Sequence, residues 1–337
     1  MLKVAINGYG RIGRNVHRQF IQRFSDQVEV VAVNASSDAD IRAYLLRYDS
    51  LHGKMDADIQ VKGDDFSVNG KLVKVVKEKE PSKCPWKELG VDIVIEATGH
   101  FRTSEKASAH LDAGAKKVIV TAPMKDDTPT FVKGVNDNEL TPDLNIFSNA
   151  SCTTNCIAPV IKTMDEAFGV EHLLVSSVHA FTGSQNLLDN KPEDGNFRRS
   201  RAATLSIIPT KTGAVKACGV IFPHLQGKMD GMAFRVPVPT VSCAYMAFTV
   251  KKDTSAEEVN ETLKKATQDP SMKEVMAVCE EHLVSIDFMT DPHSSIVDAI
   301  STKVVDSKAV QLLSWYDNEW GYAMRVTEMV VRVGEWI

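Results

Sequence analysis

The chain has 337 residues, of which 43% are hydrophobic, so it can bury a full core and exceeds the usual size of one domain. Its formal net charge of −5 provides no basic stripe for nucleic-acid phosphates, and we expect no nucleic-acid partner. No run approaches the ~18 apolar residues that span a bilayer, and the opening residues MLKVAINGYG lack a basic and apolar leader. We therefore expect a cytoplasmic protein of two domains without a membrane partner.

Short β-branched runs alternate with a helical stretch in the first half of the chain. This alternation is typical of βαβ units and predicts a parallel sheet. The segments are KVAING (3–8), RNVHRQFIQRF (14–24), VEVVAVN (28–34), VDIVIEATG (91–99) and KKVIVTAP (116–123).

Beyond about residue 150 the apolar runs become longer and more alternating. The segments LLVSSVHAF (173–181), MAFRVPV (232–238) and CAYMAFTVK (243–251) predict strands of an antiparallel sheet with one solvated or subunit-facing side. Between the first two lies a polar segment, residues 183–201, which contains Gly and Pro and has no period. It predicts a long functional loop.

Two helices are expected in the last third of the chain. Ser255 and Glu258 form the pattern of a capping box and predict a helix that starts at Ser255. The segment NEWGYAMRVTEMVVRVGEW (318–336) is amphipathic and predicts a C-terminal helix.

The first chemical motif is GYGRIG (8–13), with Gly8, Gly10 and Gly13 at dinucleotide-binding spacing. Glycines permit a tight turn and the close approach of a pyrophosphate to the first N–H groups of a helix. Among 19 glycines this pattern can also arise in an ordinary turn. Its position between a predicted strand and a predicted helix favours a nucleotide site.

The expected ribose-binding acid is missing from the tip of the second strand. An NAD site usually has a carboxylate about 20 residues after the glycines. Here the strand ends in VAVNASSD, with Asn34, Ala35, Ser36 and Ser37 at the tip. The nearest acid, Asp38, is expected to lie too far round the turn to reach the ribose. One explanation for the missing carboxylate is drift in a site that still binds NAD.

The stretch SNASCTTNCIAP (148–159) places Cys152 just before an apolar, helix-compatible run. A helix N-terminus favours a thiolate and offers N–H groups to an oxyanion. Cys156 lies one turn later and is expected to pack beneath. His179, at the end of a predicted strand, is the best-placed base among nine histidines, although an inert buried cysteine and an edge histidine are the alternatives. The six cysteines suggest neither a disulfide framework nor a metal site.

Several motifs occur in one order across nearly the whole chain: INGYGRIGR, SNASCTTNC, VHAFT, RRSRAAT, IIPTKTGAVKA, RVPVP and WYDNEWGY. Together they resemble the phosphorylating glyceraldehyde-3-phosphate dehydrogenases. The resemblance implies an α/β fold with an N-terminal Rossmann domain (1–151), an α+β catalytic domain with a mainly antiparallel sheet (152–317) and a C-terminal helix that returns to the first domain (318–337). It also implies a homotetramer in which the loop 183–201 reaches toward a neighbour's cofactor.

The resemblance further implies oxidative phosphorylation of D-glyceraldehyde 3-phosphate to 1,3-bisphosphoglycerate with reduction of NAD or NADP, in glycolysis, gluconeogenesis or carbon fixation. Cys152 matches the nucleophile that forms a hemithioacetal and then a thioester, and His179 matches the base. Inorganic phosphate then attacks the thioester.

The site residues of the family can be placed on this sequence one by one. Thr182, Arg199 and Arg235 match the pocket for the substrate phosphate, and Ser151, Thr153, Thr212 and Gly213 match the pocket for the incoming phosphate. The expected cofactor contacts are Asn7, Gly8, Gly10, Arg11, Ile12, Gly13, Asn34, Ala35, Ser36, Lys79, Thr98, Thr121 and Asn318. Among them, Asn318 matches the family residue that fixes the nicotinamide carboxamide.

The sequence departs from the family at several of these positions. Ala35 stands where the ribose-binding Asp is usual, and Lys79 where an Arg is usual. We therefore predict that NADP is accepted at least as well as NAD. One apparent inserted residue before Arg198 makes Arg199, rather than Arg198, the aligned phosphate ligand, and Gly183-Ser184 replaces the commoner Asn-Asp pair.

Three other functions are compatible with parts of this pattern. An erythrose-4-phosphate dehydrogenase shares the Cys, His and nucleotide site, although Thr182 favours the triose. A semialdehyde dehydrogenase would not need a sugar-phosphate pocket at Thr182 and Arg235. A non-catalytic dinucleotide-binding protein would not need Cys152, His179 and two anion pockets.

Overall fold

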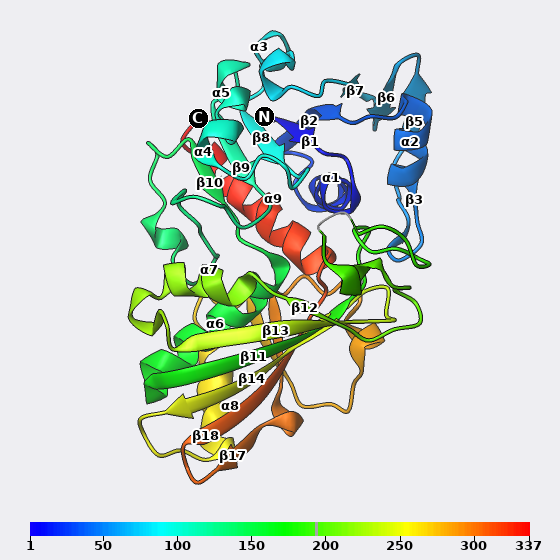
Figure 1. Cartoon of the computed structure of the whole chain (residues 1–337). Coiled ribbons are helices and arrows are strands. Elements are labelled where there is room, and N and C mark those ends of the chain that lie inside the picture. The colour runs from blue at the N-terminus through cyan, green and yellow to red at the C-terminus, as the bar shows by residue number, and fades with distance from the viewer. Residues whose placement is uncertain (193–194) are drawn as a thin grey trace. The chain divides into compact units, whose positions relative to one another are not determined.

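The structure is a computed structural model that describes residues 1–192 and 195–337. These residues form two compact units. Unit 1 comprises Met1–Phe131, Glu139–Ala150 and Ala323–Ile337, and unit 2 comprises Val132–Asn138 and Ser151–Tyr322. Each unit has its own large sheet, labelled in Figure 1. Within the described ranges, we find no helix with the length and apolar character needed to cross a membrane.

Unit 1 is built on an eight-stranded sheet in the order β10-β9-β8-β1-β2-β7-β6-β5. The strands from β10 to β7 are parallel, which confirms the predicted βαβ organisation. The strand bounds are β1 Leu2–Asn7, β2 Val28–Asn34, β5 Ile59–Lys62, β6 Asp65–Val68, β7 Lys71–Val76, β8 Ile93–Glu96, β9 Lys117–Val120 and β10 Ile146–Ser148.

Strands β5, β6 and β7 pair antiparallel, a feature that the sequence analysis did not predict. The β6–β7 turn carries Asn69 at φ 49° and Gly70 at φ 81°, and the β5–β6 turn carries Gly63 at φ 65°. An Asn-Gly pair with both residues at positive φ is the preferred two-residue hairpin turn. The local sequence VNGK was therefore a usable hairpin signal. A small two-stranded sheet joins β3 (Tyr48–Asp49) and β4 (Gly53–Lys54).

The helices of unit 1 connect its parallel strands. They are α1 Arg11–Arg23, α2 Ala39–Arg47, α3 Trp86–Leu89, α4 Ser104–Ala107 and α5 Ala109–Asp112, with a 3₁₀ turn at Pro81–Lys83. The predicted C-terminal helix is α9 (Trp320–Gly334), whose residues from Ala323 onward belong to unit 1. Its close approach to β1 requires a glycine, because a Cβ on Gly334 would lie 2.7 Å from the Leu2 side chain.

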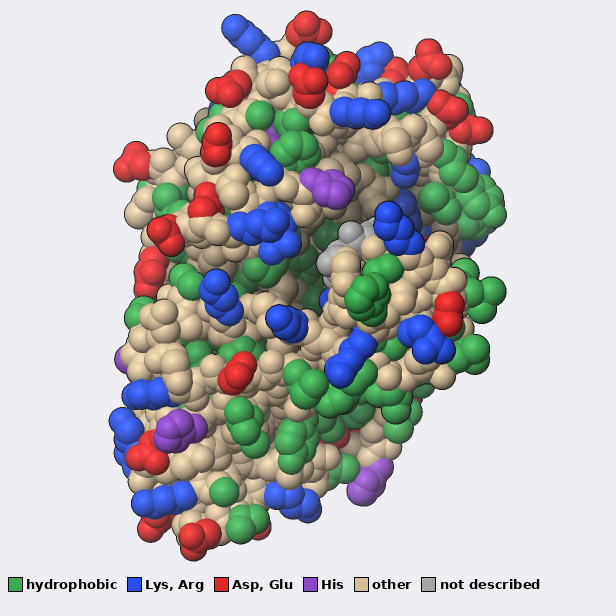
Figure 2. All heavy atoms as spheres, in the orientation of Figure 1, with side chains coloured by type: hydrophobic (Ala, Val, Ile, Leu, Met, Phe, Trp, Pro, Cys, Tyr) green, Lys and Arg blue, Asp and Glu red, His purple; other side chains and the backbone are tan. Residues whose placement is uncertain are grey.

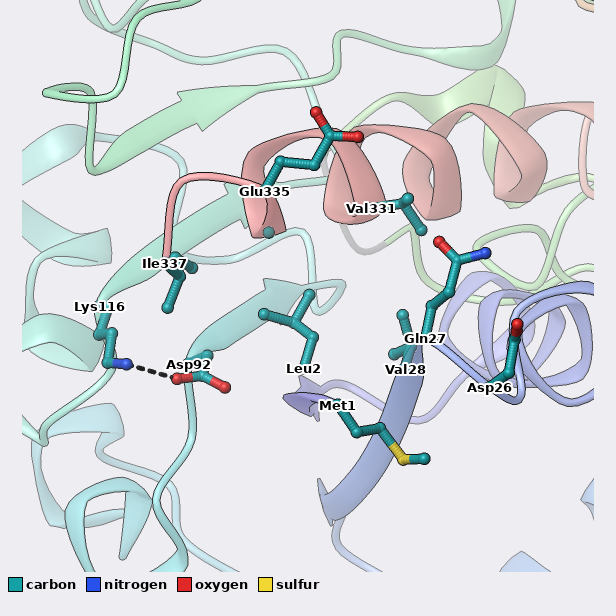
Figure 3. A pocket seen from close by; sticks show the side chains of 11 residues that line it. Met1, Leu2, Asp26, Gln27, Val28, Asp92, Lys116, Val331, Glu335 and Ile337 are labelled. Carbon is teal, nitrogen blue, oxygen red and sulfur yellow. Dashed lines mark ion pairs between the residues drawn. The ribbon is translucent and has the colours of Figure 1, made fainter.

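A pocket of about 410 Å³ lies where the end of α9 meets the first residues of β1 and β2 (Figure 3). Asp92 and Lys116 form an ion pair of 2.7 Å at its edge. The pocket is at the amino ends of the parallel strands, since it includes Leu2 and Val28. Ligands of open α/β sheets bind at the opposite, carboxyl edge, so this pocket is not the nucleotide site.

Unit 2 contains the second sheet, in the order β12-β13-β11-β14-β18-β16-β15, with β17 paired to β18. The predicted mainly antiparallel sheet is confirmed, with parallel pairing only at β11–β13 and β15–β16 in the described part. The strand bounds are β11 Val170–Ala180, β12 Ile208–Lys211, β13 Met229–Val236, β14 Ser242–Val250, β15 Met276–Cys279, β16 Ser295–Asp298, β17 Lys303–Val305 and β18 Ala309–Tyr316.

Helix α6 (Cys152–Phe168) contacts β11, β14, β16 and β18, and it also packs against α7 (Ala214–Ile221) and α8 (Ala256–Ala266). Other side chains of the sheet remain exposed, notably Leu174 on β11 and Met232 on β13. Hydrophobic side chains reach the surface in the lower half of Figure 2, where Figure 1 draws these strands.

Two predictions for unit 2 need correction in detail. Strand β13 ends at Val236, so Pro237 and Val238 are not in the predicted strand. Ser255 caps α8 by accepting from the Glu258 N–H at 3.2 Å, as predicted. The Glu258 carboxylate, however, accepts from the Thr254 hydroxyl at 3.0 Å and does not complete the capping box. A nearby hydroxyl outside the helix competes with the Ser255 N–H for that acceptor.

The segment 183–201 is predominantly irregular where it is described, as predicted, with one 3₁₀ turn at Phe197–Ser200. Residues 193–194 of the predicted loop lie outside the described residues. The remaining 3₁₀ turns of the chain are Asp137–Glu139, Pro223–Leu225, Ser285–Phe288 and Ala299–Ser301.

His17 is a buried histidine on α1 that faces the core of unit 1. Its Nδ1 lies 2.6 Å from the Tyr9 hydroxyl, and its ring lies 6.4 Å from that of Phe66. Burial lowers the pKa of His17 from 6.5 to about 3. An unfolded chain therefore binds one more proton than the folded chain between these two pH values.

We predict that His17 makes the free energy of unfolding fall as the pH is lowered from about 6.5 toward 3, by up to about 1.4 kcal/mol per pH unit. Urea unfolding of the wild type and of His17→Asn at neutral and acidic pH measures this. The variant should lose less stability than the wild type on acidification, because it lacks the buried imidazole. Equal losses in wild type and His17→Asn would refute the prediction.

Candidate functional site

Cys152 is the first residue of α6, as predicted. Ser151 caps the helix, since its hydroxyl accepts from the Thr154 N–H at 3.2 Å. The chain enters the cap through Ala150, which is fully buried and has φ 56°. Cys152 remains partly exposed, and the helix N-terminus directs its positive dipole end toward this thiol.

Cys156 lies one turn further along α6 and is fully buried, as predicted. Its sulfur is 3.9 Å from the carbonyl oxygen of Ser314. Burial raises the pKa of the Cys156 thiol to about 12. A buried thiol of such low acidity is a poor nucleophile.

His179 lies near the end of β11 with its Nε2 atom 3.5 Å from the Cys152 sulfur. Its other ring nitrogen, Nδ1, is 2.7 Å from the Ala180 carbonyl oxygen. Two acceptors cannot approach so closely without a proton between them, so Nδ1–H donates to the carbonyl. The neutral imidazole then presents its Nε2 lone pair to the thiol.

Burial acts against the charged form of both members of this pair. Burial raises the pKa of Cys152, while Arg235 and the Thr153 hydroxyl act in the opposite direction. Burial, and then the charge of Arg235, lower the pKa of His179 to about 3. The Arg235 guanidinium therefore favours a thiolate over an imidazolium at this site.

Tyr316 contacts the His179 ring and residues close in sequence to Cys152 and His179, and the sequence analysis did not single it out. Its hydroxyl lies 2.9 Å from the Thr153 hydroxyl and 3.1 Å from that of Ser177. Its ring meets the His179 ring edge-on, with centroids 6.0 Å apart. Tyr316 is on β18, more than a hundred residues from its partners in the chain, so spacing along the sequence carried no signal for it.

Arg235, on β13, lies beside His179. Its Nη1 donates to the Ala180 carbonyl at 3.0 Å and is 2.9 Å from His179 Nδ1. Its Nε is buried and has no hydrogen-bond partner within the described ranges. A buried guanidinium N–H without an acceptor fits an anion-binding role.

The other predicted phosphate ligands of unit 2 lie on loops and helix ends. The Arg199 Nε donates to Thr210 at 3.1 Å, and its charge lowers the pKa of His179. Gly213 is the N-cap of α7, and the Thr212 hydroxyl accepts from the Ala214 N–H at 3.2 Å. The Thr182 hydroxyl lies 3.1 Å from that of Ser184.

The predicted pyrophosphate loop connects β1 to α1. Gly8 has φ 95°, and a Cβ there would lie 2.6 Å from the backbone of Thr98. Gly10 is the N-cap of α1, and a Cβ there would meet no atom within 4 Å. The helix has no side-chain cap and no acidic residue in its first turn, so the N–H groups of Arg11 and Ile12 suit a phosphate. The Arg11 side chain itself pairs with Asp49, a partner the sequence analysis missed.

Glu96 is a second missed residue, and it joins two predicted cofactor residues. This fully buried carboxylate at the end of β8 accepts from the Asn7 side chain and from both the backbone N–H and the hydroxyl of Thr98. His110 Nε2 lies 3.1 Å from it, while Trp86 donates to His110 Nδ1 at 3.0 Å. Because Trp86 donates to His110 Nδ1, the His110 Nε2–H is the donor toward Glu96, and several hydrogen bonds therefore reach this carboxylate.

The strand tip predicted to hold the ribose lies at the end of β2. The Asn34 side-chain amide donates to Asn7 Oδ1 at 2.7 Å, and its oxygen accepts from the Glu78 N–H at 3.0 Å. The second bond connects the segment after β7 to this strand tip. Asp38 is paired with Lys77. Ser36 and Lys79 are exposed. Thr121 donates through its hydroxyl to the Glu96 carbonyl at 3.1 Å.

Asn318, the predicted carboxamide ligand, lies in unit 2 just after β18 and is 4% exposed. In residues 1–192 and 195–337 there is no group of three His, Cys, Asp or Glu side chains that could hold a metal ion.

Both halves of the sequence match known protein domains. Residues 2–104 match the NAD binding domain of glyceraldehyde 3-phosphate dehydrogenase, and residues 151–318 match the C-terminal domain of that enzyme. A glyceraldehyde-3-phosphate dehydrogenase 2 from Bacillus subtilis is 48% identical over 98% of this chain and 96% of its own length. The chain belongs to the glyceraldehyde-3-phosphate dehydrogenase family.

Further relatives extend this family match. A glyceraldehyde-3-phosphate dehydrogenase of Geobacillus stearothermophilus is 47% identical over 98% of both chains. A chloroplastic glyceraldehyde-3-phosphate dehydrogenase A of Zea mays is also 47% identical, over 97% of this chain and 81% of its own length. Within this oxidoreductase family match, Gly8, Gly10 and Gly13 lie in the first matched domain, and Cys152 and His179 lie in the second.

Proposed function

We propose that this protein oxidises D-glyceraldehyde 3-phosphate and captures the product as 1,3-bisphosphoglycerate, with NAD or NADP as hydride acceptor. The observation that carries the proposal is the approach of Cys152 Sγ to His179 Nε2, at 3.5 Å, on the first residue of a helix. The family match supports the aldehyde substrate.

In the first step the Cys152 thiol gives its proton to His179 Nε2 and its sulfur adds to the aldehyde carbon. The forming oxyanion can be held by N–H groups at the start of α6, and it takes the proton back from His179 to give a neutral hemithioacetal. The Ala180 carbonyl keeps the Nδ1 proton in place, so the same Nε2 atom serves each transfer.

In the second step His179 removes the hemithioacetal hydroxyl proton as a hydride leaves the same carbon. The nicotinamide cofactor supplies the hydride acceptor when it is bound. A thioester on Cys152 results. An oxygen of inorganic phosphate attacks its carbonyl carbon, the C–S bond breaks, and the acyl phosphate departs as the thiolate is regenerated.

The two phosphate groups call for two cationic or N–H-lined pockets, for which unit 2 provides candidates. The unpartnered Nε of Arg235 and the neighbouring charge of Arg199 support their assignment to the substrate phosphate, together with Thr182. Ser151, Thr153, Thr212 and Gly213 are assigned to the incoming phosphate, with the N-terminus of α7 as a source of N–H donors.

Cys152→Ser should abolish turnover and leave cofactor binding intact, because a hydroxyl is a far weaker nucleophile than a thiol in this setting. Alkylation with iodoacetamide followed by peptide mass mapping should find the label on Cys152, while Cys156→Ser should keep both activity and labelling. Inactivation with the label on Cys156 and none on Cys152 would show that the nucleophile is misassigned.

The substrate assay also separates the nearest alternative. Initial rates with glyceraldehyde 3-phosphate should exceed those with erythrose 4-phosphate when phosphate is present. The reverse order would assign the protein to the erythrose-4-phosphate dehydrogenases and keep the same chemistry at Cys152.

We further propose that NADP is accepted at least as well as NAD. Ala35 places no carboxylate at the strand tip to bind the ribose diol or repel a 2′-phosphate. Asp38, the nearest acid, is engaged by Lys77. Lys79 is exposed and makes no ion pair with any described residue. Ser36, which follows Ala35 in the sequence, is also exposed. Both side chains can therefore meet an added 2′-phosphate.

Ala35→Asp should shift the ratio of kcat/KM for NADP to that for NAD by about one to two decades toward NAD, because each 1.4 kcal/mol is a factor of ten. Lys79→Gln should weaken NADP selectively. Lys77→Gln is the matched control, since this lysine is already neutralised by Asp38. A strong wild-type preference for NAD that Ala35→Asp leaves unaltered would contradict the proposal.

We also propose that the protein is a cytoplasmic homotetramer. We further propose that each chain has three functional parts, residues 1–151, 152–317 and 318–337. The exposed apolar side chains of the unit 2 sheet and of the loop 183–201 support subunit contacts, for example Leu174, Leu187, Leu188 and Phe197 at 63–83% exposure. Native mass spectrometry tests this, and a monomer at micromolar concentration would contradict it.

A further inference from the structure

A chain of hydrogen bonds connects the end of β11 to Asn318 through the hydroxyl of Ser242. The Ala180 N–H donates to Ser242 Oγ at 3.0 Å, and Ser242 Oγ donates to Asn318 Oδ1 at 2.9 Å. We call this chain the Ser242 bridge. All three residues are buried, with Ser242 at 2% and Asn318 at 4% exposure.

The Ser242 bridge determines which end of the Asn318 amide points away from it. The Ser242 hydroxyl proton has one acceptor within the described ranges, Asn318 Oδ1. The amide oxygen is therefore the end that faces Ser242. The amide NH₂ group is left without a hydrogen-bond partner among the described residues. A side-chain amide without this bond could rotate and offer either its oxygen or its nitrogen.

The backbone on both sides of the bridge is firmly held. Asp317 accepts from the N–H groups of Glu319 and Trp320 at 3.0 and 2.9 Å, which fixes the turn that carries Asn318. Val241, just before Ser242, is 2% exposed and has φ 62°. A β-branched residue at positive φ is strained, and such strain persists only where the surroundings determine the backbone strongly.

We infer that Ser242 is a positioning residue, which orients the Asn318 amide so that its NH₂ group is presented to the carbonyl oxygen of the cofactor carboxamide. This inference rests on the proposed role of Asn318. Ser242 does not touch the reacting atoms and acts through Asn318 alone. Its removal should therefore weaken cofactor binding only while the Asn318 amide is present.

A double-mutant cycle on cofactor binding tests this without substrate. Calorimetric Kd values for the oxidised cofactor would be measured with wild type, Ser242→Ala, Asn318→Ala and the double variant. We expect Ser242→Ala to raise Kd about three- to tenfold, the range of one hydrogen bond, and to have no further effect in the Asn318→Ala background. Ser295→Ala is the control, because it removes another fully buried hydroxyl, which bonds Ser314 at 2.7 Å.

Conservative variants separate positioning from folding. Ser242→Thr keeps the hydroxyl and should restore most of the affinity, and Ser242→Cys, of similar volume but with weak hydrogen bonding, should reproduce the loss if the alanine variant does not fold. Equal Kd values for wild type and Ser242→Ala, or additive effects in the double variant, would overturn the role of Ser242 alone. An unchanged Kd in Asn318→Ala would overturn the role of Asn318 as well.

Discussion

The hydrogen bond from His179 Nδ1 to the Ala180 carbonyl is the constraint on which the proposed chemistry depends. It determines which ring nitrogen keeps its proton, and thereby leaves Nε2 to face the Cys152 sulfur at 3.5 Å. Arg235 donates to the same carbonyl, so the residue that we assign to the substrate phosphate and the residue that we propose as the base share one anchor. Burial, and then the charge of Arg235, lower the pKa of His179 and so disfavour its imidazolium form.

Buried polar groups position the site at the cost of strain and desolvation. Glu96 is a fully buried carboxylate that is hydrogen-bonded by Asn7, Thr98 and His110. Tyr316 holds Thr153 and Ser177, and the residues before two site positions, Ala150 and Val241, have positive φ. Such arrangements reduce stability unless every partner is present, and here they lie beside the residues that we predict to bind and react.

The sequence was most informative where local rules apply. The strand–glycine–helix order predicted β1 and α1, and the apolar run after Cys152 predicted the start of α6 with Cys156 beneath it. Partners from distant segments were not predictable: Asp49 for Arg11, and Tyr316 for Thr153, which is 163 residues away. The position of Arg235 beside His179 was also not predictable, because it depends on the pairing of β11 with β13 rather than on spacing along the chain.

The most direct test of this account is the pH dependence of Cys152 alkylation in the wild type and in His179→Asn. In the wild type the thiol can pass its proton to Nε2, whereas in the variant it must ionise to water at a site where burial raises its pKa. The account predicts that the midpoint of alkylation moves upward in His179→Asn by about one pH unit or more, equivalent to at least ~1.4 kcal/mol. Identical midpoints in the two proteins, with near-normal turnover of the variant, would contradict it.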